Sequence, residues 1–323
     1  MNRFDYTPAE ATTDPSRLGL SASVRALAGG TDLLPRLKLG LEAPERLVDL
    51  KTSGLDGAID RTGAGWRIGA LATLRDLQRH PGLRASAPAL VEAAEQAATA
   101  QIRNRATVAG NLLQRPRCWY FRHEHRRCWL SGGDGCPARD GRNEHHAVFD
   151  TSPCVAVHPS DAAAALVALG GRVTVRDAGG ERDLAVAELL APPTEDRRTE
   201  HLLGDHALVT AVTVPDGAAG RSTYLKAMDR AVWAFALVGV AAAVTTDDDG
   251  TVRSIDVVAS GVANVPWRLT AVEDAVQGRV LDDRTCRAAG EAATVGATPL
   301  AHNAYKLGLL RQLTRRALAD LAR

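Results

Sequence analysis

Apolar and polar residues follow two periods along this chain, and together they predict both strands and helices. Short apolar or alternating runs predict strands at 24–28, 46–50, 172–176, 207–214, 224–228, 234–246 and 252–261, and a hairpin over 58–70. Runs bounded by capping residues, glycine or proline predict a helix ending at 39 and helices over 71–79, 88–98, 162–169, 186–190, 270–276, 284–295 and 304–321. The pattern therefore predicts a globular fold in which strands and helices are mixed.

The segment 215–220 separates two halves of this pattern. It is rich in proline, glycine and alanine, which favours a linker. The three strands and three helices beyond it predict a three-stranded sheet covered by helices. The last helix carries an apolar stripe that is most simply core, made of Leu310, Leu313, Ala317 and Leu321. Cys286, on the preceding helix, is expected to be a buried small apolar residue.

Size and charge narrow the class of protein. The 323 residues are enough for two or three domains, and 39 basic against 38 acidic residues give no charge signature for nucleic acid. No run reaches the roughly 18 apolar residues of a membrane span, and the first residues lack the apolar core of an export signal. We therefore expect no membrane span and a cytoplasmic chain, with the periplasm as the alternative if a partner carries an export signal for the complex.

A strand, a glycine turn and a helix start follow one another over 24–39. Gly29 and Gly30 leave backbone N–H groups uncovered, and Thr31 or Asp32 is placed to cap the helix. Such a turn can bind phosphate or pyrophosphate, although glycine turns before helices are also common without a ligand. A second glycine-bearing turn lies at 107–111. No Rossmann or Walker pattern is present, so an NAD-binding domain or a P-loop is not supported.

Four of the five cysteines lie in one stretch after the second turn. Cys118, Cys128, Cys136 and Cys154 have the spacing C-x9-C-x7-C-x17-C, which lacks the close cysteine pairs of zinc fingers and ribbons. Four thiolates gathered by an irregular loop are what a [4Fe-4S] cluster needs. Two disulfides or four unrelated thiols are the alternatives, but a chain of this size can bury its own core without disulfides.

The composition around the cysteines favours a long irregular loop. Glycine and proline interrupt helix and strand there, at Pro116, Gly132, Gly133, Gly135, Pro137 and Gly141. Aromatic residues that could shield a cluster from solvent are Trp119, Tyr120, Phe121 and Trp129. Nearby arginines form either a partner-facing or anion-facing surface or a solvated face: Arg115, Arg117, Arg122, Arg126 and Arg127. Histidines that are metal ligands or, more simply, polar loop residues are His123, His125, His145, His146 and His158.

Several motifs, in order along nearly the whole chain, resemble the FAD-binding subunit of the xanthine dehydrogenase family of molybdenum hydroxylases. They are A-G-G-T-D-L at 28–33, I-G-A at 68–70 with Thr73, T-V-A-G-N at 107–111, P-S-D at 159–161, and Tyr224-x-Lys226 with Arg230. The insert beginning R-C-W-Y-F at 117–121 is similar to the branch whose FAD subunit also carries a [4Fe-4S] cluster, namely periplasmic aldehyde oxidoreductases of the YagS type and, more distantly, 4-hydroxybenzoyl-CoA reductase.

The resemblance implies an α+β fold. A PCMH-type FAD-binding domain would span 1–217, with subdomains of about 1–53 and 54–217 and an iron-sulfur loop over 115–158. A C-terminal domain similar to that of CO dehydrogenase flavoproteins, with a three-stranded sheet and helices, would span 218–323. FAD would lie in a cleft between the subdomains.

The resemblance also implies site residues. The predicted FAD-binding residues are Ala28, Gly29, Gly30, Thr31, Asp32, Leu33, Thr73, Thr107, Ala109, Gly110, Asn111, Asp161 and Lys226. The predicted cluster ligands are Cys118, Cys128, Cys136 and Cys154. Asp161 would bind near the adenine or ribitol, or only cap a helix, and Lys226 would approach the isoalloxazine, or only be a surface strand residue. Ala109 replaces the first glycine of the usual Gly-Gly-Asn, so we expect a negative φ there.

The function implied by the resemblance is electron transfer, with no catalytic side chain. FAD would take electrons from [2Fe-2S] centres and pass them to an external acceptor. The expected partners are a molybdopterin-binding large subunit and a [2Fe-2S] small subunit, and the [4Fe-4S] cluster would serve mainly a structural or interface role. Two alternatives are a stand-alone PCMH-type flavin oxidase or reductase and a flavin-free cluster- or zinc-binding assembly protein.

Overall fold

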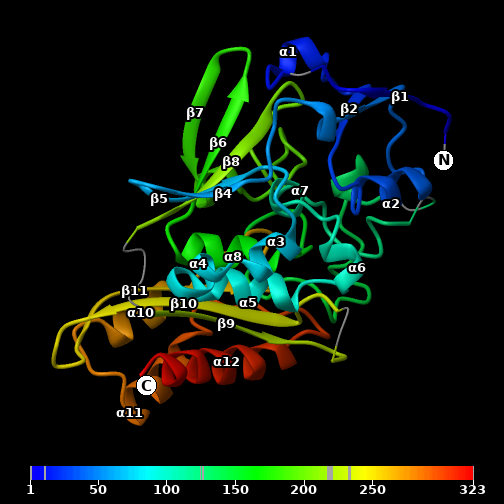
Figure 1. Cartoon of the computed structure of the whole chain (residues 1–323). Coiled ribbons are helices and arrows are strands. Elements are labelled where there is room, and N and C mark those ends of the chain that lie inside the picture. Colours follow the sequence, from blue (N-terminus) through cyan, green and yellow to red (C-terminus); the bar gives the residue numbers. More distant parts are fainter. Residues whose placement is uncertain are drawn as a thin grey trace.

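The computed structural model describes residues 2–10, 12–123, 125, 127–216, 221–231 and 234–322 (Figure 1). These residues form three β-sheets with helices packed between and around them. The predicted α+β class is confirmed. Most of the predicted linker at 215–220 lies outside the described residues, and the predicted domain bounds remain a prediction.

The N-terminal sheet is parallel and has the strand order β1-β3-β2. Its strands are β1 (Asp5–Pro8), β2 (Val24–Leu27) and β3 (Arg46–Asp49), followed by the 3-10 helix η1 (Leu50–Thr52). The helices are α1 (Pro15–Leu18) and α2 (Leu33–Lys38). Leu33 and Leu37 of α2 pack on Leu27 and Leu47 of the sheet. This packing places the glycine turn after β2 at the start of α2. The pattern missed β1 because its residues are mostly exposed.

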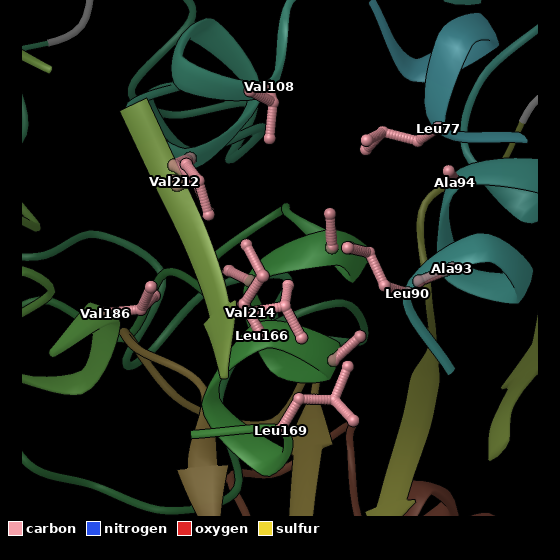
Figure 2. Close-up of a cluster of buried hydrophobic side chains, with 14 of the residues drawn as sticks. Leu77, Leu90, Ala93, Ala94, Val108, Leu166, Leu169, Val186, Val212 and Val214 are labelled. Atoms are coloured by element: carbon pink, nitrogen blue, oxygen red, sulfur yellow. The ribbon is translucent and has the colours of Figure 1, made fainter. Parts of the chain in front are cut away.

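The second sheet has the order β4-β5-β8-β6-β7, with antiparallel pairing throughout. Its strands are β4 (Ile59–Thr62), β5 (Gly65–Gly69), β6 (Arg172–Asp177), β7 (Gly180–Ala185) and β8 (Leu208–Pro215). The helices of this part are α3 (Leu74–Arg79), α4 (Pro81–Ser86), α5 (Pro88–Gln96), α6 (Ala100–Arg103), α7 (Val108–Leu112), α8 (Asp161–Ala168) and α9 (Val186–Leu189). Figure 2 shows Leu90 of α5 and Leu166 of α8 in the same apolar core as Val212 of β8. The exposed edge strand β7 gave no apolar pattern.

The third sheet is antiparallel and has four strands in the order β12-β11-β10-β9, where the sequence predicted three. Its strands are β9 (Arg221–Ala227), β10 (Val238–Thr246), β11 (Val252–Ser260) and β12 (Trp267–Arg268). The last helices are α10 (Thr270–Val276), α11 (Asp283–Ala292) and α12 (Tyr305–Leu321). Figure 1 shows this sheet between α5 and α8 on one side and α12 on the other, so it packs against both halves of the chain. The two residues of β12 are too few to show the alternation of apolar and polar residues that predicts a strand.

Between α7 and α8 the described residues form neither a strand nor an α-helix, and the 3-10 helix η2 (Trp129–Ser131) is the regular element there. We call residues 115–158 the cysteine loop. The loop nevertheless has its own small apolar core, in which Tyr120, Phe121, Trp129 and Leu130 are buried. The predicted irregular loop is therefore present and is internally packed. None of the described helices is long and apolar enough to cross a membrane.

Candidate cofactor sites

A cavity of about 520 Å³ lies where the turn between β2 and α2 meets the start of α7. Cavities of this size commonly hold small ligands and cofactors. The predicted FAD-binding residues that line it are Ala28, Gly29, Gly30, Thr31, Asp32, Leu33, Thr107, Ala109 and Gly110. Residues of the wall that the sequence did not single out for this role include Arg36, Arg115 and His201. Both glycine-bearing turns therefore face one space.

Two glycines of the first turn are required by its geometry. Gly30 has a φ of +71°, a conformation that side-chain-bearing residues rarely adopt. A Cβ on Gly29 would lie 1.8 Å from the carbonyl oxygen of Arg105, so only glycine allows this approach of the two backbones. The turn can thus present its N–H groups to an anion without a side chain in the way.

The prediction of a turn at 107–111 is wrong, because residues 108–112 form the short helix α7. Thr107 is its N-cap and accepts a hydrogen bond from the Gly110 N–H at 3.2 Å. Ala98 is the one described non-glycine residue with a positive φ, so Ala109 has the negative φ that we expected. The start of a helix carries partial positive charge, which suits a phosphate group.

The side chain of Asp32 does not cap α2, although Asp32 occupies the N-cap position. Its carboxylate instead accepts from Arg122 at 2.7 Å and pairs with Arg117 at 2.8 Å and Arg36 at 3.1 Å. The backbone N–H of Arg115 also donates to it at 3.1 Å. Burial would raise the pKa of Asp32, but these guanidinium groups outweigh it and lower the pKa. Asp32 therefore holds the cysteine loop against the wall of the cavity.

Arg115, Arg117 and Arg122 do not form a solvated face, contrary to that alternative, whereas Arg127 is exposed to solvent. The Arg115 guanidinium lies 3.2 Å from the buried carboxylate of Glu200, while Arg117 and Arg122 bind Asp32. The positive charges of these three arginines are therefore balanced by carboxylates of the chain itself. Arg126 lies outside the described residues.

Thr73 and Asn111 do not line the cavity. Thr73 forms a capping box with Asp76 at the start of α3 and an isolated β-bridge with Thr107. The side-chain oxygen Oδ1 of Asn111 accepts from the Ser160 hydroxyl at 2.5 Å, which ties α7 to the start of α8. In this structure both residues support the elements that form the wall, and their contact with FAD remains a prediction.

Asp161 and Lys226 form a buried ion pair, 2.7 Å apart, with side chains 4% and 1% exposed. Lys226 also donates to the carbonyl oxygens of Gln96 at 3.0 Å and Ala234 at 2.9 Å, and the Tyr224 hydroxyl donates to Asp161 at 2.6 Å. The alternative of a surface lysine is thus wrong. Ser160, not Asp161, caps α8. The pair joins α8 to β9 and lies outside the lining of the cavity, so the predicted flavin contacts of both residues remain predictions.

The four cysteines of the loop belong to one small core. Cys128 and Cys154 are buried within it, and Cys118 and Cys136 pack against it half-buried. All are free thiols, so the disulfide alternative is not realised in this structure. Cys286 is buried elsewhere, on α11 in the C-terminal core, as expected.

The thiols influence each other's ionisation. Burial raises the pKa of Cys118 to about 12, and the neighbouring Cys128 and Cys136 add to the effect. A hydrogen bond between Cys136 and Cys154 lowers the pKa of Cys136 to about 6 and raises that of Cys154. Ionising Cys118 and Cys154 in this core is therefore unfavourable unless a cationic group replaces their protons.

The geometry of the four cysteines bears on which metal group they would bind. Among the described residues, no three His, Cys, Asp or Glu side chains form a set tight enough for a single metal ion. A zinc ion needs all its ligands within about 2.3 Å of one centre. In a [4Fe-4S] cluster each cysteine binds a different iron, so the sulfurs lie further apart. The four cysteines of one small core supply the number and kind of ligands that a [4Fe-4S] cluster needs.

The histidines of the loop differ sharply from one another. The Nε2 atom of His146 lies 3.2 Å from the sulfur of Cys118. His123 and His125 pack on each other, His145 is exposed, and His158 accepts from the Ser160 N–H at 3.4 Å. Nothing in the sequence distinguished His146 from the other four.

A glycine turn and a helix start that face one cavity are features of sites for the phosphate groups of a cofactor. The chain belongs to the FAD-binding subunits of the molybdenum hydroxylase family. Residues 4–217 match the FAD binding domain in molybdopterin dehydrogenase, and residues 223–321 match the CO dehydrogenase flavoprotein C-terminal domain. The predicted family is confirmed, and the chain is an oxidoreductase subunit.

The similarity to known proteins extends over nearly the whole chain. It is 37% identical to the aldehyde oxidoreductase FAD-binding subunit PaoB of Escherichia coli K12, over 99% of this chain and 98% of that protein. A chain in the solved structure of carbon monoxide dehydrogenase from Hydrogenophaga pseudoflava, which lacks the Mo-pyranopterin moiety, superposes with a TM-score of 0.76 at 25% identity, covering 98% and 96% of the two chains. Quinoline 2-oxidoreductase from Pseudomonas putida 86 gives the same TM-score at 20% identity, covering 99% and 97%, and shares the fold.

Proposed function

We propose that this chain is the FAD- and [4Fe-4S]-containing electron-transfer subunit of an aldehyde oxidoreductase of the molybdenum hydroxylase family. The observation that carries the proposal is the convergence of four buried or half-buried cysteines in a loop whose arginines also bind Asp32, on the wall of the FAD cavity. Full-length similarity to an aldehyde oxidoreductase FAD-binding subunit supports the aldehyde class.

The chain's own residues would bind and orient FAD. The N–H groups of residues 29–33 would hold the pyrophosphate, and the partial positive charge at the start of α7 would lie beside it. FAD, once bound, supplies the redox chemistry that connects [2Fe-2S] centres to an external acceptor. No side chain is needed as a nucleophile or general base.

Cys118, Cys128, Cys136 and Cys154 would ligate the [4Fe-4S] cluster, and its role would be mainly structural or at an interface. The loop is bonded to the C-terminal half of the chain as well as to the cavity wall. The Asn264 side chain donates to the carbonyl oxygens of Cys154 at 3.0 Å and Ala156 at 2.7 Å. A cluster that fixes the loop would therefore fix the junction between the two halves.

The partners follow from the family. A molybdopterin-binding large subunit would carry out the substrate chemistry, and a small [2Fe-2S] subunit would deliver electrons to this chain. Names of similar proteins, such as carbon monoxide dehydrogenase medium chain, describe one subunit of a larger enzyme. This makes a stand-alone flavin oxidase the less favoured reading.

The test is a cofactor analysis of the complex, purified without oxygen after co-expression with its partner genes. We expect about one FAD per chain and about four irons and four sulfides beyond those of the [2Fe-2S] subunit. Cys118→Ser should lose these irons, whereas Cys286→Ser, which changes a cysteine of the C-terminal core, should keep them.

Other outcomes would replace the proposal. Zinc without sulfide, or a folded chain without flavin, would indicate the assembly protein. Oxidation of a reduced substrate by the isolated chain would indicate the stand-alone flavoenzyme.

A further inference from the structure

One buried imidazole is directed at a cysteine of the loop. His146 is 2% exposed, and its Nε2 atom lies 3.2 Å from the Cys118 sulfur. Its other ring nitrogen, Nδ1, is buried without a hydrogen-bond partner among the described residues. The Cys118 sulfur is the polar atom that faces Nε2, and the backbone carbonyl oxygen of Asn143 also acts on the ring.

The position of the ring proton follows from these contacts. A proton on Nδ1 alone would turn the Nε2 lone pair toward a sulfur that, as a ligand, is anionic, and the two would repel each other. A proton on Nε2 gives an N–H···S hydrogen bond instead.

Helix α12 and the residues just before it fix the backbone that carries this ring. The carbonyl oxygen of His146 accepts from the Asn303 side chain at 3.2 Å and from the Lys306 ammonium at 2.9 Å, and both of these side chains are 0% exposed. Trp119, next to Cys118, packs edge-on against the ring, with centroids 5.2 Å apart. The ring is therefore held from the C-terminal half on one side and from the cysteine loop on the other.

We propose that His146 is a positioning residue of the cysteine site, which donates its Nε2–H to the ligating sulfur of Cys118 and thereby raises the reduction potential of the cluster. The inference rests on the proposed [4Fe-4S] function. A hydrogen bond to a ligating sulfur stabilises the more negative, reduced state, and such bonds are among the determinants of cluster potential. Because Lys306 of α12 binds the carbonyl oxygen of His146, the C-terminal half of the chain would fix the geometry of this N–H···S hydrogen bond.

The test uses the anaerobic complex and does not depend on turnover. Midpoint potentials are measured by redox titration followed by EPR in wild type, His146→Phe, His146→Gln and the matched control His145→Phe, whose histidine is exposed. We expect a lower potential for the [4Fe-4S] signal in His146→Phe, a smaller change in His146→Gln, which keeps an N–H donor, and none in the control. The [2Fe-2S] signals of the partner serve as an internal reference.

A second readout is independent of any variant. Pulsed EPR of the reduced wild-type cluster should show a weakly coupled exchangeable proton that disappears in D2O. Strong nitrogen coupling would make His146 a ligand and overturn the proposal, as would an unchanged potential in His146→Phe at full iron content. Loss of the cluster in both His146→Phe and His146→Gln would also overturn it. Absence of iron and sulfide in the wild type would instead refute the proposed function.

Discussion

Arg122 donates a hydrogen bond to Asp32 at 2.7 Å, although the two residues are 90 positions apart in the chain. Asp32 belongs to the glycine turn that lines the cavity, and Arg122 follows Cys118 in the cysteine loop. Both side chains are 11% exposed, so solvent screens the pair little. The two candidate cofactor sites are therefore joined by a direct, largely buried contact.

Asp32→Asn tests this connection. The change removes the charge that compensates three arginines in a mostly buried position, and breaking a buried ion pair costs about 3–5 kcal/mol. We expect lower unfolding free energy in urea and reduced content of both FAD and iron in the purified complex. Asp134→Asn, at an exposed position of the same loop, is the control. Loss of FAD with full iron content would show that the two sites are independent.

The sequence predicted the strand, glycine turn and helix start over 24–39, because these are local features, but it took the start of α7 for a turn. It could not predict the partners of Asp32, since a capping aspartate and an aspartate bound by distant arginines look the same in sequence. The same limit applies to His146, whose contact with Cys118 depends on how the loop folds back. Strands with exposed residues, such as β1 and β7, were missed because burial is what creates the pattern.

Gly29→Ala should damage the cavity wall. The added Cβ would lie 1.8 Å from the Arg105 carbonyl oxygen, and a backbone atom cannot move aside as a flexible side chain can. We expect a loss of at least about 1–3 kcal/mol of stability and reduced FAD content, measured by thermal unfolding and flavin absorbance. Gly63→Ala, in the β4–β5 turn with no atom within 4 Å of the new Cβ, is the matched control. Equal behaviour of the two variants would contradict the close approach.

The buried pair Asp161 and Lys226 should be strongly coupled. Asp161→Asn or Lys226→Met alone leaves its partner charged and buried, so each should cost about 3–5 kcal/mol. The double variant should cost clearly less than the sum of the two, because no uncompensated charge remains. Urea unfolding of the four proteins measures this coupling. Additive losses would mean that the ion pair contributes little beyond its separate contacts.

Lys306 should make stability depend on pH. It is 0% exposed on α12, and burial lowers its pKa from 10.5 to about 7. Between these two pH values the unfolded chain binds the proton and the native chain does not, so this lysine's contribution to stability rises with pH by about 1.4 kcal/mol per pH unit. Below about pH 7 both states are protonated and the contribution is constant at its lowest value.

The measurement is the difference in unfolding free energy between wild type and Lys306→Met at several pH values. Because other titrating groups are common to both proteins, they cancel in the difference. We expect wild type to gain on the variant from pH 7 to pH 9 and the difference to be flat from pH 6 to pH 7. Lys38→Met, at the exposed end of α2, is the control. A difference that does not change above pH 7 would mean that Lys306 stays charged in the native state, held by the carbonyl oxygens of His146 and Gly261.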